Sequence, residues 1–138
     1  MITPPEQLLF LPGASGNTQF WCPVAELLST TAQKKHVGWP GFGDTPSSPG
    51  VASMDDLVAR VVADIDRPSA LVAQSMGGIV AVRVALEHPG LITHLVLTVT
   101  SGGVDMSDLG FTHSPAVAGL IDQHLDCGFL SSRHGALP

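Results

Sequence analysis

The sequence predicts an α/β fold in which a parallel sheet carries helices on both faces. Apolar runs of strand length alternate with helical stripes from Gln7 to Thr100, in the order β-α-β-α-β-α-β. Apolar residues make up 44% of the chain and charged residues 13%, which suits a sheet that is covered on both sides. A sharp strand-turn-helix junction at Ser75 is the third indication. Parallel strands joined in this way require right-handed crossovers.

The first strand is expected at residues 7–11, because this run is apolar throughout and is bounded by proline on both sides. The segment that follows, residues 12–17, contains Gly13 and Gly16, which let the backbone turn sharply. Two interpretations of this segment stay open. It is a plain turn, or it is a loop whose N–H groups can hold an anion.

A first helix is expected from about Thr18 to Ser29, starting nearer Cys22 if Pro23 is to lie in its first turn. Its apolar face would consist of Phe20, Val24, Leu27 and Leu28. Trp21 is interpreted as a packing residue at the helix entrance. A second, weaker strand is expected at residues 33–39, and a long loop rich in proline and glycine follows it.

The next helix is expected to begin at Ser53, because Asp56 three residues later completes an aspartate variant of the capping box. Its apolar stripe is the clearest in the chain and consists of Met54, Leu57, Val58, Val61, Val62 and Ile65. Asp55 and Asp56 together could suggest a metal site. Acidic residues in a first turn also stabilise a helix by interacting with the positive end of its dipole, and this structural interpretation is adopted.

The remaining elements surround Ser75. An apolar strand over residues 70–73 leads to the serine, and a helix follows it to about His88, where Pro89-Gly90 is a stop signal. A fourth strand is expected from Ile92 to Thr100. Residues 1–109 are therefore predicted to form the α/β part of the protein, and residues 110–138 a C-terminal segment of uncertain structure with one candidate helix at 117–125.

Small residues flank Ser75 at the positions where a sharp turn needs them. In a G-x-S-x-G turn the serine backbone is strained, so the residues two before and two after it come close together. Ala73 and Gly77 occupy these positions. Such a turn lifts the serine hydroxyl clear of the sheet, and the start of the next helix directs free N–H groups toward it. The simpler alternative is an ordinary strand-to-helix connection, in which serine is common.

Three motifs resemble those of the α/β-hydrolase superfamily, in the family's order: Leu11-Pro12-Gly13-Ala14, Gly38-Trp39-Pro40-Gly41-Phe42-Gly43-Asp44 and Ala73-Gln74-Ser75-Met76-Gly77-Gly78. The resemblance extends from Gln7 to about Asp108 and implies a partial α/β-hydrolase fold. In that fold the strands ending at Pro12 and Ser75 are neighbours, and ligands bind where the strand order changes direction. The resemblance further implies that Ser75 is the nucleophile and that the N–H groups of Ala14 and Met76 form the oxyanion hole. Pro12 stands where the family frequently has histidine.

The resemblance also calls for a histidine base and a carboxylate, both after the nucleophile in the chain. His36, His88 and His94 are interpreted as structural from their positions. The candidates that remain for the base are His113, His124 and His134, and those for the carboxylate are Asp105, Asp108, Asp122 and Asp126. No recognisable strand precedes these histidines. The chain therefore resembles the first part of a hydrolase, either truncated or with an unrelated C-terminal segment.

Two functional hypotheses follow from the resemblance. The first is a serine hydrolase that acts on an ester, thioester or related acyl bond of a small molecule through an acyl-enzyme. The second is a catalytically inactive fragment or partner-binding remnant, because losing a triad member can cost on the order of a millionfold in turnover. A dinucleotide-binding protein is a distant third, since the Gly-x-Gly at 41–43 lacks its third glycine and a helix directly behind it.

Association through a sheet edge is a further prediction. If the last strands are missing, the apolar strand at 95–99 becomes an edge with unpaired N–H and C=O groups, a template for a homodimer or other association. Residues 111–125 would prevent this if they folded over that edge.

Composition excludes several other classes of partner. The net charge is −6 and the pI is near 5.3, which argues against nucleic acid as a binding partner. The start of the chain lacks a basic segment followed by an apolar one, and no run approaches eighteen apolar residues, so a cytoplasmic protein without membrane contact is expected. Cys22 and Cys127 are isolated and are expected to be inert thiols, and neither a metal nor another cofactor is predicted.

Overall fold

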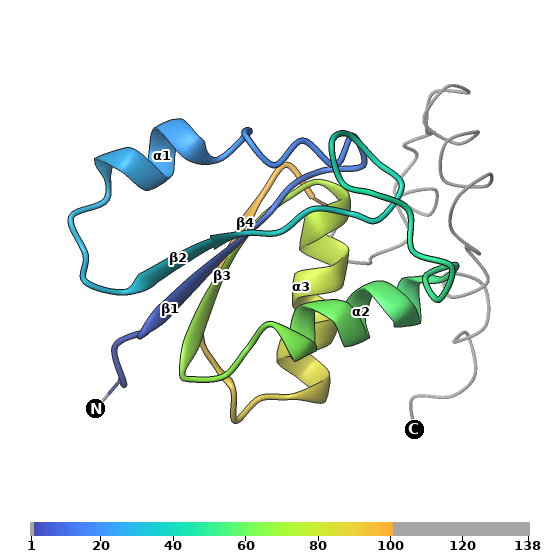
Figure 1. Ribbon diagram of the computed structural model, residues 1–138. Coiled ribbons are helices and arrows are strands. Elements are labelled where there is room, and N and C mark those ends of the chain that lie inside the picture. Colours follow the sequence, from blue (N-terminus) through green and yellow to red (C-terminus); the bar gives the residue numbers. More distant parts are fainter. Residues whose placement is uncertain (1, 101–138) are drawn as a thin grey trace, which may run out of the picture.

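Four parallel strands form one sheet in the computed structural model, which describes residues 2–100 (Figure 1). The strand order is β2-β1-β3-β4, and the bounds are β1 (Gln7–Leu11), β2 (Gln33–His36), β3 (Ser69–Gln74) and β4 (Ile92–Thr98). All three pairings are parallel, which confirms the predicted sheet. The chain winds outward from β1 to β2 and then returns across β1 to β3, so the strand order changes direction between β1 and β3.

Helices cover both faces of the sheet, as predicted (Figure 1). The helices are α1 (Cys22–Leu27) on one face, and α2 (Met54–Ala63) and α3 (Met76–Glu87) on the other. Leu8 and Phe10 of β1 belong to the core under α1, whereas Leu9 and Leu11 belong to the core under α2 and α3. All five residues of β1 are buried. Full burial of a large apolar side chain contributes roughly 1.5–3 kcal/mol, so β1 is the centre of both cores.

The sequence prediction for α1 was wrong in its length and in its buried face. The helix has six residues, with Pro23 in its first turn. The predicted apolar face is exposed by 48%, 42%, 84% and 40% at Phe20, Val24, Leu27 and Leu28, respectively. Ala25 and the ring of Trp21 are buried instead, and Trp21 packs 6.2 Å from the ring of Phe10. A helix this short turns less than twice, so the bulky residue at its entrance determines its orientation.

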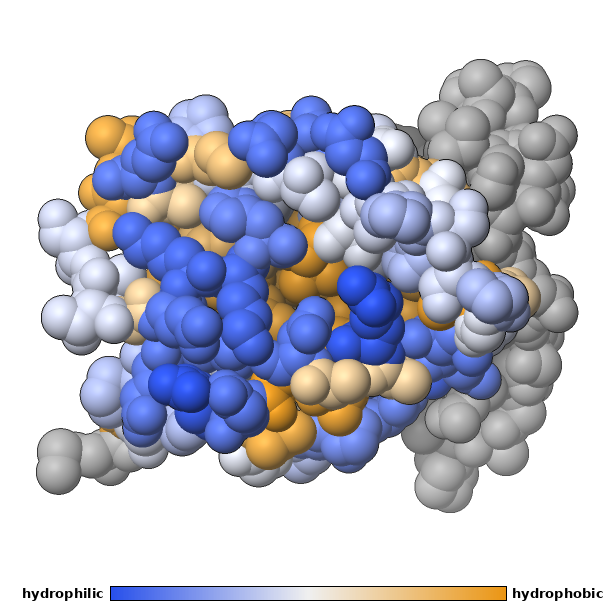
Figure 2. Space-filling view, in the orientation of Figure 1, coloured by the Kyte–Doolittle hydropathy of each residue, from blue (hydrophilic) through white to orange (hydrophobic). Residues whose placement is uncertain are grey.

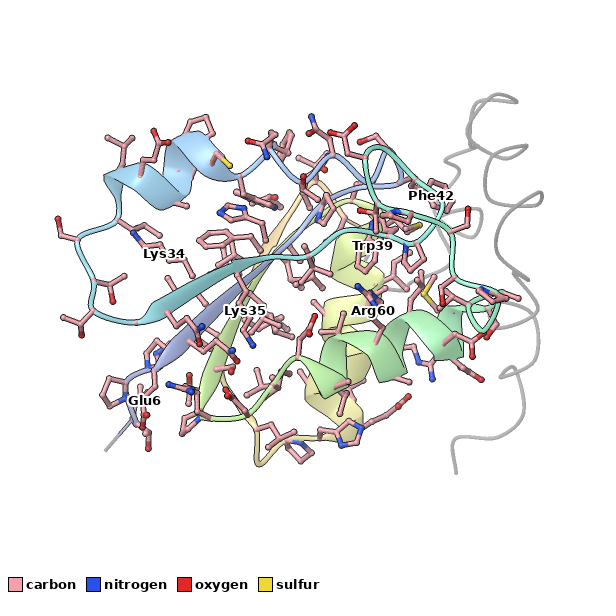
Figure 3. All side chains as sticks on the ribbon, viewed as in Figure 1. Glu6, Lys34, Lys35, Trp39, Phe42 and Arg60 are labelled. Atoms are coloured by element: carbon pink, nitrogen blue, oxygen red, sulfur yellow. The ribbon has the colours of Figure 1, made fainter. Side chains whose placement is uncertain are left out.

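Two lysines join the edge strand β2 to helices on opposite faces of the sheet. Lys34 Nζ donates to the carbonyl oxygens of Ala25 and Leu28, at 2.6 and 2.9 Å. Lys35 Nζ donates to the carbonyl of Asp64, at 2.8 Å, at the end of α2. Cations near a helix C-terminus donate hydrogen bonds to its free carbonyl groups and interact favourably with the negative end of the helix dipole. Hydrophilic residues accordingly dominate the surface over β2 in Figure 2, and Figure 3 labels both lysines.

The capping box of α2 is confirmed. The Ser53 hydroxyl accepts a hydrogen bond from the Asp56 N–H at 3.3 Å, and the Asp56 carboxylate accepts from the Ser53 N–H at 2.9 Å. A third N–H, that of Ala52, also donates to this carboxylate at 3.0 Å. The Ser53 hydroxyl also donates to this carboxylate, at 2.7 Å. The hydrogen bonds that the carboxylate accepts from the Ala52 N–H, the Ser53 hydroxyl and the Ser53 N–H, in this order of size, lower the pKa of Asp56 below its usual value of 3.8. The apolar stripe of α2 faces the core through Leu57, Val58 and Val61.

The last described strand, β4, pairs with β3 and has no second neighbour among residues 2–100. It ends at Thr98, two residues before the predicted end. Leu95, Val96 and Leu97 are exposed by 37%, 47% and 40%, so β4 is an exposed edge strand within this part of the chain. No helix in residues 2–100 is long and apolar enough to cross a membrane. The predicted segment 110–138 and its candidate helix lie outside the described residues.

Candidate active site

Ser75 stands at the corner between β3 and α3, as predicted. Its N–H donates to the carbonyl of Thr98 at 3.0 Å, beside the end of β4, and its own carbonyl accepts from the Gly78 N–H at 2.9 Å, within the first turn of α3. Its backbone has φ 52° and ψ −121°, a conformation that an L-residue rarely adopts. Such strain costs on the order of 1–3 kcal/mol and persists only where the surroundings hold it. The residue is half-buried.

Gly77 is required by the close approach of α3 to the end of β1. A Cβ at this position would overlap the carbonyl oxygen of Pro12 and would lie 2.9 Å from that of Leu11. Both atoms are backbone atoms of a buried segment, so they cannot move aside cheaply. Ala73, the other small residue at the corner, is fully buried. The prediction that both positions must be small is therefore consistent with the packing.

The loop after β1 lies beside Ser75. A Cβ on Gly13 would be 2.6 Å from Gln74 Oε1 and 3.3 Å from the Cβ of Ser75. The loop turns back at Gly16, whose N–H donates to the Gly13 carbonyl at 3.1 Å and whose φ is +66°. The expectation that the strands ending at Pro12 and Ser75 are neighbours is confirmed, because β1 and β3 pair from Gln7 to Leu11.

Several N–H groups at this corner have no hydrogen-bond acceptor within residues 2–100, including those of Gly13, Ser15 and Gly77. Two others belong to Met76, the first residue of α3, and to Ala14 in the loop after β1. The first N–H groups of a helix have no intrahelical acceptor, and they point out of its positive end. Since most buried or half-buried N–H groups in proteins are paired, two unpaired ones beside one serine form a candidate site for a negatively charged oxygen.

A second loop, residues 37–45, packs against the first. A Cβ on Gly16 would be 2.5 Å from the Cβ of Phe42, and one on Gly43, whose φ is +52°, would be 3.0 Å from the Gly16 carbonyl oxygen. Indole hydrogen bonds that the sequence reasoning missed hold the backbone here, and one of them joins the two loops. Trp39 Nε1 donates to the Gly13 carbonyl at 2.9 Å, and Trp21 Nε1 donates to that of Leu11 at 2.9 Å. The sequence could have indicated these hydrogen bonds, because the N–H group of a buried tryptophan requires an acceptor.

None of the three described histidines is placed to contact Ser75. His36 stacks on the ring of Phe10 at 5.0 Å, on the α1 face of the sheet. His88 follows the twelve-residue α3, so it lies roughly 18 Å along the helix from the serine. His94 pairs with Ala70, five residues before Ser75, roughly 16 Å along the strand. The structural interpretation of these residues fits their positions. The remaining histidines and the candidate carboxylates lie outside the described residues.

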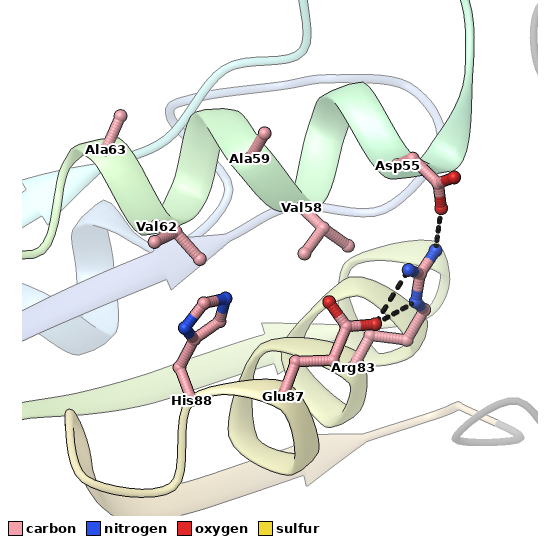
Figure 4. A pocket seen from close by; sticks show the side chains of 8 residues that line it. All are labelled: Asp55, Val58, Ala59, Val62, Ala63, Arg83, Glu87 and His88. Carbon is pink, nitrogen blue, oxygen red and sulfur yellow. Dashed lines mark hydrogen bonds and ion pairs between the residues drawn. The ribbon is translucent and has the colours of Figure 1, made fainter.

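A groove between α2 and α3 lies away from Ser75 and contains paired charges (Figure 4). Arg83 donates to Asp55 at 2.6 Å and to Glu87 at 2.7 Å, joining the two helices. Burial acts to lower the pKa of Arg83, but its hydrogen bonds to the two carboxylates outweigh burial and raise it. Asp55 thus forms an ion pair and Asp56 a cap, as the structural interpretation of this acidic pair expects. Within residues 2–100, no three potential ligand side chains gather around a metal position.

The chain resembles several known proteins in sequence and structure. The family model described as "Alpha/beta hydrolase family" matches residues 8–136. The pimeloyl-[acyl-carrier protein] methyl ester esterase of Aliivibrio salmonicida is 31% identical over 94 residues, which is 68% of this chain and 36% of the esterase. The chain spans 36% to 43% of the length of the curated relatives it matches.

Solved structures give the same result. The type II thioesterase BorB from the borrelidin biosynthetic cluster is 29% identical, with a TM-score of 0.56 over 68% of this chain and 41% of the thioesterase. MenH from S. aureus is 26% identical, with a TM-score of 0.61 over 75% of this chain and 41% of MenH. The family model covers more than half of the sequence, and the folds agree. The chain belongs to the alpha/beta hydrolase family.

Proposed function

We propose that this chain forms the nucleophile-bearing part of a serine hydrolase that cleaves an ester, thioester or related acyl bond of a small molecule. Ser75 is the nucleophile, and the N–H groups of Ala14 and Met76 are the donors that stabilise the oxyanion. The observation that carries the proposal is the strained, half-buried Ser75 beside the N–H groups of Ala14 and Met76, which have no acceptor in the described part of the chain.

The proposed reaction has two steps. The Ser75 hydroxyl loses its proton to a base while its oxygen attacks the acyl carbon, and the negative charge moves to the former carbonyl oxygen. Hydrogen bonds from Ala14 and Met76 stabilise that charge. A single donor of this kind contributes on the order of 2.7–4 kcal/mol to the transition state. The leaving group departs with a proton, and water then hydrolyses the acyl-enzyme.

The relatives support an acyl bond as the target without identifying the substrate. One is named as a methyl ester esterase and another as a type II thioesterase. Both cleave a bond between an acyl carbon and an oxygen or sulfur atom, which is the bond that a serine nucleophile and an oxyanion site can break. No cofactor is needed for this chemistry in the proposal, and the cytoplasmic location remains a prediction from the sequence.

A catalytically inactive remnant is the second candidate function. It is favoured by the positions of His36, His88 and His94, none of which can activate Ser75. The base must therefore come from outside residues 2–100, with His113, His124 and His134 as the candidates in this chain. Without a base, substrate binding and the two donors alone would leave a rate about 10³- to 10⁴-fold above the uncatalysed rate.

A fluorophosphonate probe separates the two candidates. The Ser75 oxygen would displace fluoride from phosphorus, and intact-mass analysis would record one adduct. Wild-type protein and Ser29→Ala, a matched change at an exposed serine, should be labelled, whereas Ser75→Ala should not. A folded wild-type sample that stays unlabelled would exclude the hydrolase and favour the inactive remnant.

We also propose that the β4 edge mediates association, as a homodimer or with another chain. The two edges of the described sheet differ, since β2 carries lysines that discourage pairing and β4 carries exposed Leu95, Val96 and Leu97. Sedimentation of wild type and of Leu97→Lys at several concentrations tests this. Concentration-dependent association that the lysine removes is expected, and a monomer at every concentration contradicts the proposal.

A further inference from the structure

Trp39 is a fully buried residue whose only polar atom reaches the loop after β1. Its Nε1 lies 2.9 Å from the Gly13 carbonyl oxygen and 3.3 Å from that of Pro12. The ring belongs to the core cluster that also contains Leu11 and Met76. Figure 3 shows its side chain beside the start of α3. The indole therefore connects the core under Ser75 to the backbone of the loop that faces this serine.

The carbonyl that Trp39 holds belongs to the same peptide unit as the N–H of Ala14. Residues 2–100 contain no cis peptide bond, so this unit is trans. In a trans peptide the C=O and the N–H point in opposite directions. Fixing the Gly13 carbonyl toward the indole therefore fixes the Ala14 N–H away from it. The Gly16 N–H donates to the same oxygen at 3.1 Å and supports the same orientation.

Without the indole, only the hydrogen bond from the Gly16 N–H would hold this peptide unit, and the unit could turn over more easily. Gly13 lacks a Cβ, so the rotation that exchanges the positions of C=O and N–H meets little steric resistance at this residue. The rotated unit would present its carbonyl oxygen where the N–H had been. A partial negative charge would then face the developing oxyanion and would repel it.

We propose that Trp39 is a positioning residue that selects the orientation in which the Ala14 N–H faces the reaction site. This role rests on the proposed function, because it presumes that an oxyanion forms at Ser75. Its effect is exerted through the Gly13–Ala14 peptide and not by contact with the substrate. Complete loss of one such donor slows a serine protease about 10²- to 10³-fold, so partial loss of orientation should slow this reaction about 10- to 100-fold.

The test compares Trp39→Phe with Trp21→Phe. Each variant removes a buried indole and a hydrogen bond of 2.9 Å to a backbone carbonyl. Trp21 holds the carbonyl of Leu11, the last residue of β1, whereas Trp39 holds that of Gly13 and lies 3.3 Å from that of Pro12. Labelling rates with the fluorophosphonate are measured together with the free energy of unfolding of each variant. We expect labelling to slow about 10- to 100-fold in Trp39→Phe and less than about 3-fold in Trp21→Phe.

A second measurement separates orientation from packing. Replacing Trp39 by β-(3-benzothienyl)alanine keeps the shape of the side chain but puts sulfur in place of the N–H. Labelling by this protein should be as slow as in Trp39→Phe. The amide signal of Ala14, followed by ¹⁵N–¹H NMR, should move downfield on phosphonylation of the wild type and stay in place in the isostere.

The outcomes of these measurements differ for the two proposals. An unlabelled wild type overturns the proposed function and, with it, the positioning role. A wild type that is labelled, together with an isostere that is labelled equally fast, overturns the positioning role alone. Equal slowing in the Trp39 and Trp21 variants, in proportion to their lost stability, also overturns it, because packing would then explain the effect.

Discussion

Gly77→Ala tests the contact that brings Ser75 next to the loop after β1. In a helix interior this change would normally stabilise the protein by about 0.8–1.0 kcal/mol, because alanine is the better helix former. Here the new Cβ would overlap the Pro12 carbonyl oxygen and lie 2.9 Å from that of Leu11. Overpacking against a buried core typically costs about 1–3 kcal/mol, and two backbone atoms that cannot move aside cheaply place this change in the upper part of that range. After the gain in helix propensity is subtracted, we expect a net destabilisation of about 1–2 kcal/mol.

Urea unfolding, followed by the fluorescence of Trp21 and Trp39, measures this change. With a slope of about 1–2 kcal/mol per molar urea, the midpoint should fall by roughly 1 M. Gly90→Ala is the matched control, because a Cβ there meets nothing within 4 Å. The midpoint of the control should change by less than about 0.5 M. If Gly77→Ala were as stable as Gly90→Ala, α3 would not lie against the end of β1 as described.

Three further predictions concern Ser75 and the cap of α2. Ser75→Gly should be about 1 kcal/mol more stable to urea than Ser75→Ala, because glycine tolerates φ 52°; equal stabilities would show that the corner is unstrained. Ser53→Ala should lose about 1 kcal/mol in the same assay, and an unchanged midpoint would exclude the cap. Because the folded pKa of Asp56 is lowered, its stabilising effect is complete above its unfolded pKa, near 3.8, and is lost as the pH falls through the folded value. Asp56→Asn should therefore show a smaller drop in urea midpoint than wild type below about pH 4, and an identical pH profile would contradict this.

The sequence predicted the fold where local patterns and tertiary packing agree. β1 is apolar at five successive positions and is buried on both faces. The stripe and the capping box of α2 depend on residues within two turns of one another, so they could be identified without knowledge of the fold. The corner at Ser75 was identified from the small residues around it.

Other features depend on contacts that no local pattern encodes. The periodicity around α1 indicated the wrong face, because six residues and Pro23 leave the orientation to Trp21. The hydrogen bond from Trp39 to Gly13 joins residues 26 positions apart. The neighbouring positions of the Ser75 corner and the Pro12–Gly16 loop followed from the family resemblance and not from periodicity. The candidates for the base, His113, His124 and His134, lie outside the described residues.

The most direct measurement of the central claim is a crystal structure of the protein after reaction with a fluorophosphonate. The account predicts phosphorus bonded to Ser75 Oγ, with one phosphonyl oxygen about 2.7–3.1 Å from the backbone nitrogens of both Ala14 and Met76. An adduct on another residue, or an adduct on Ser75 whose oxygen faces away from both nitrogens, would contradict it.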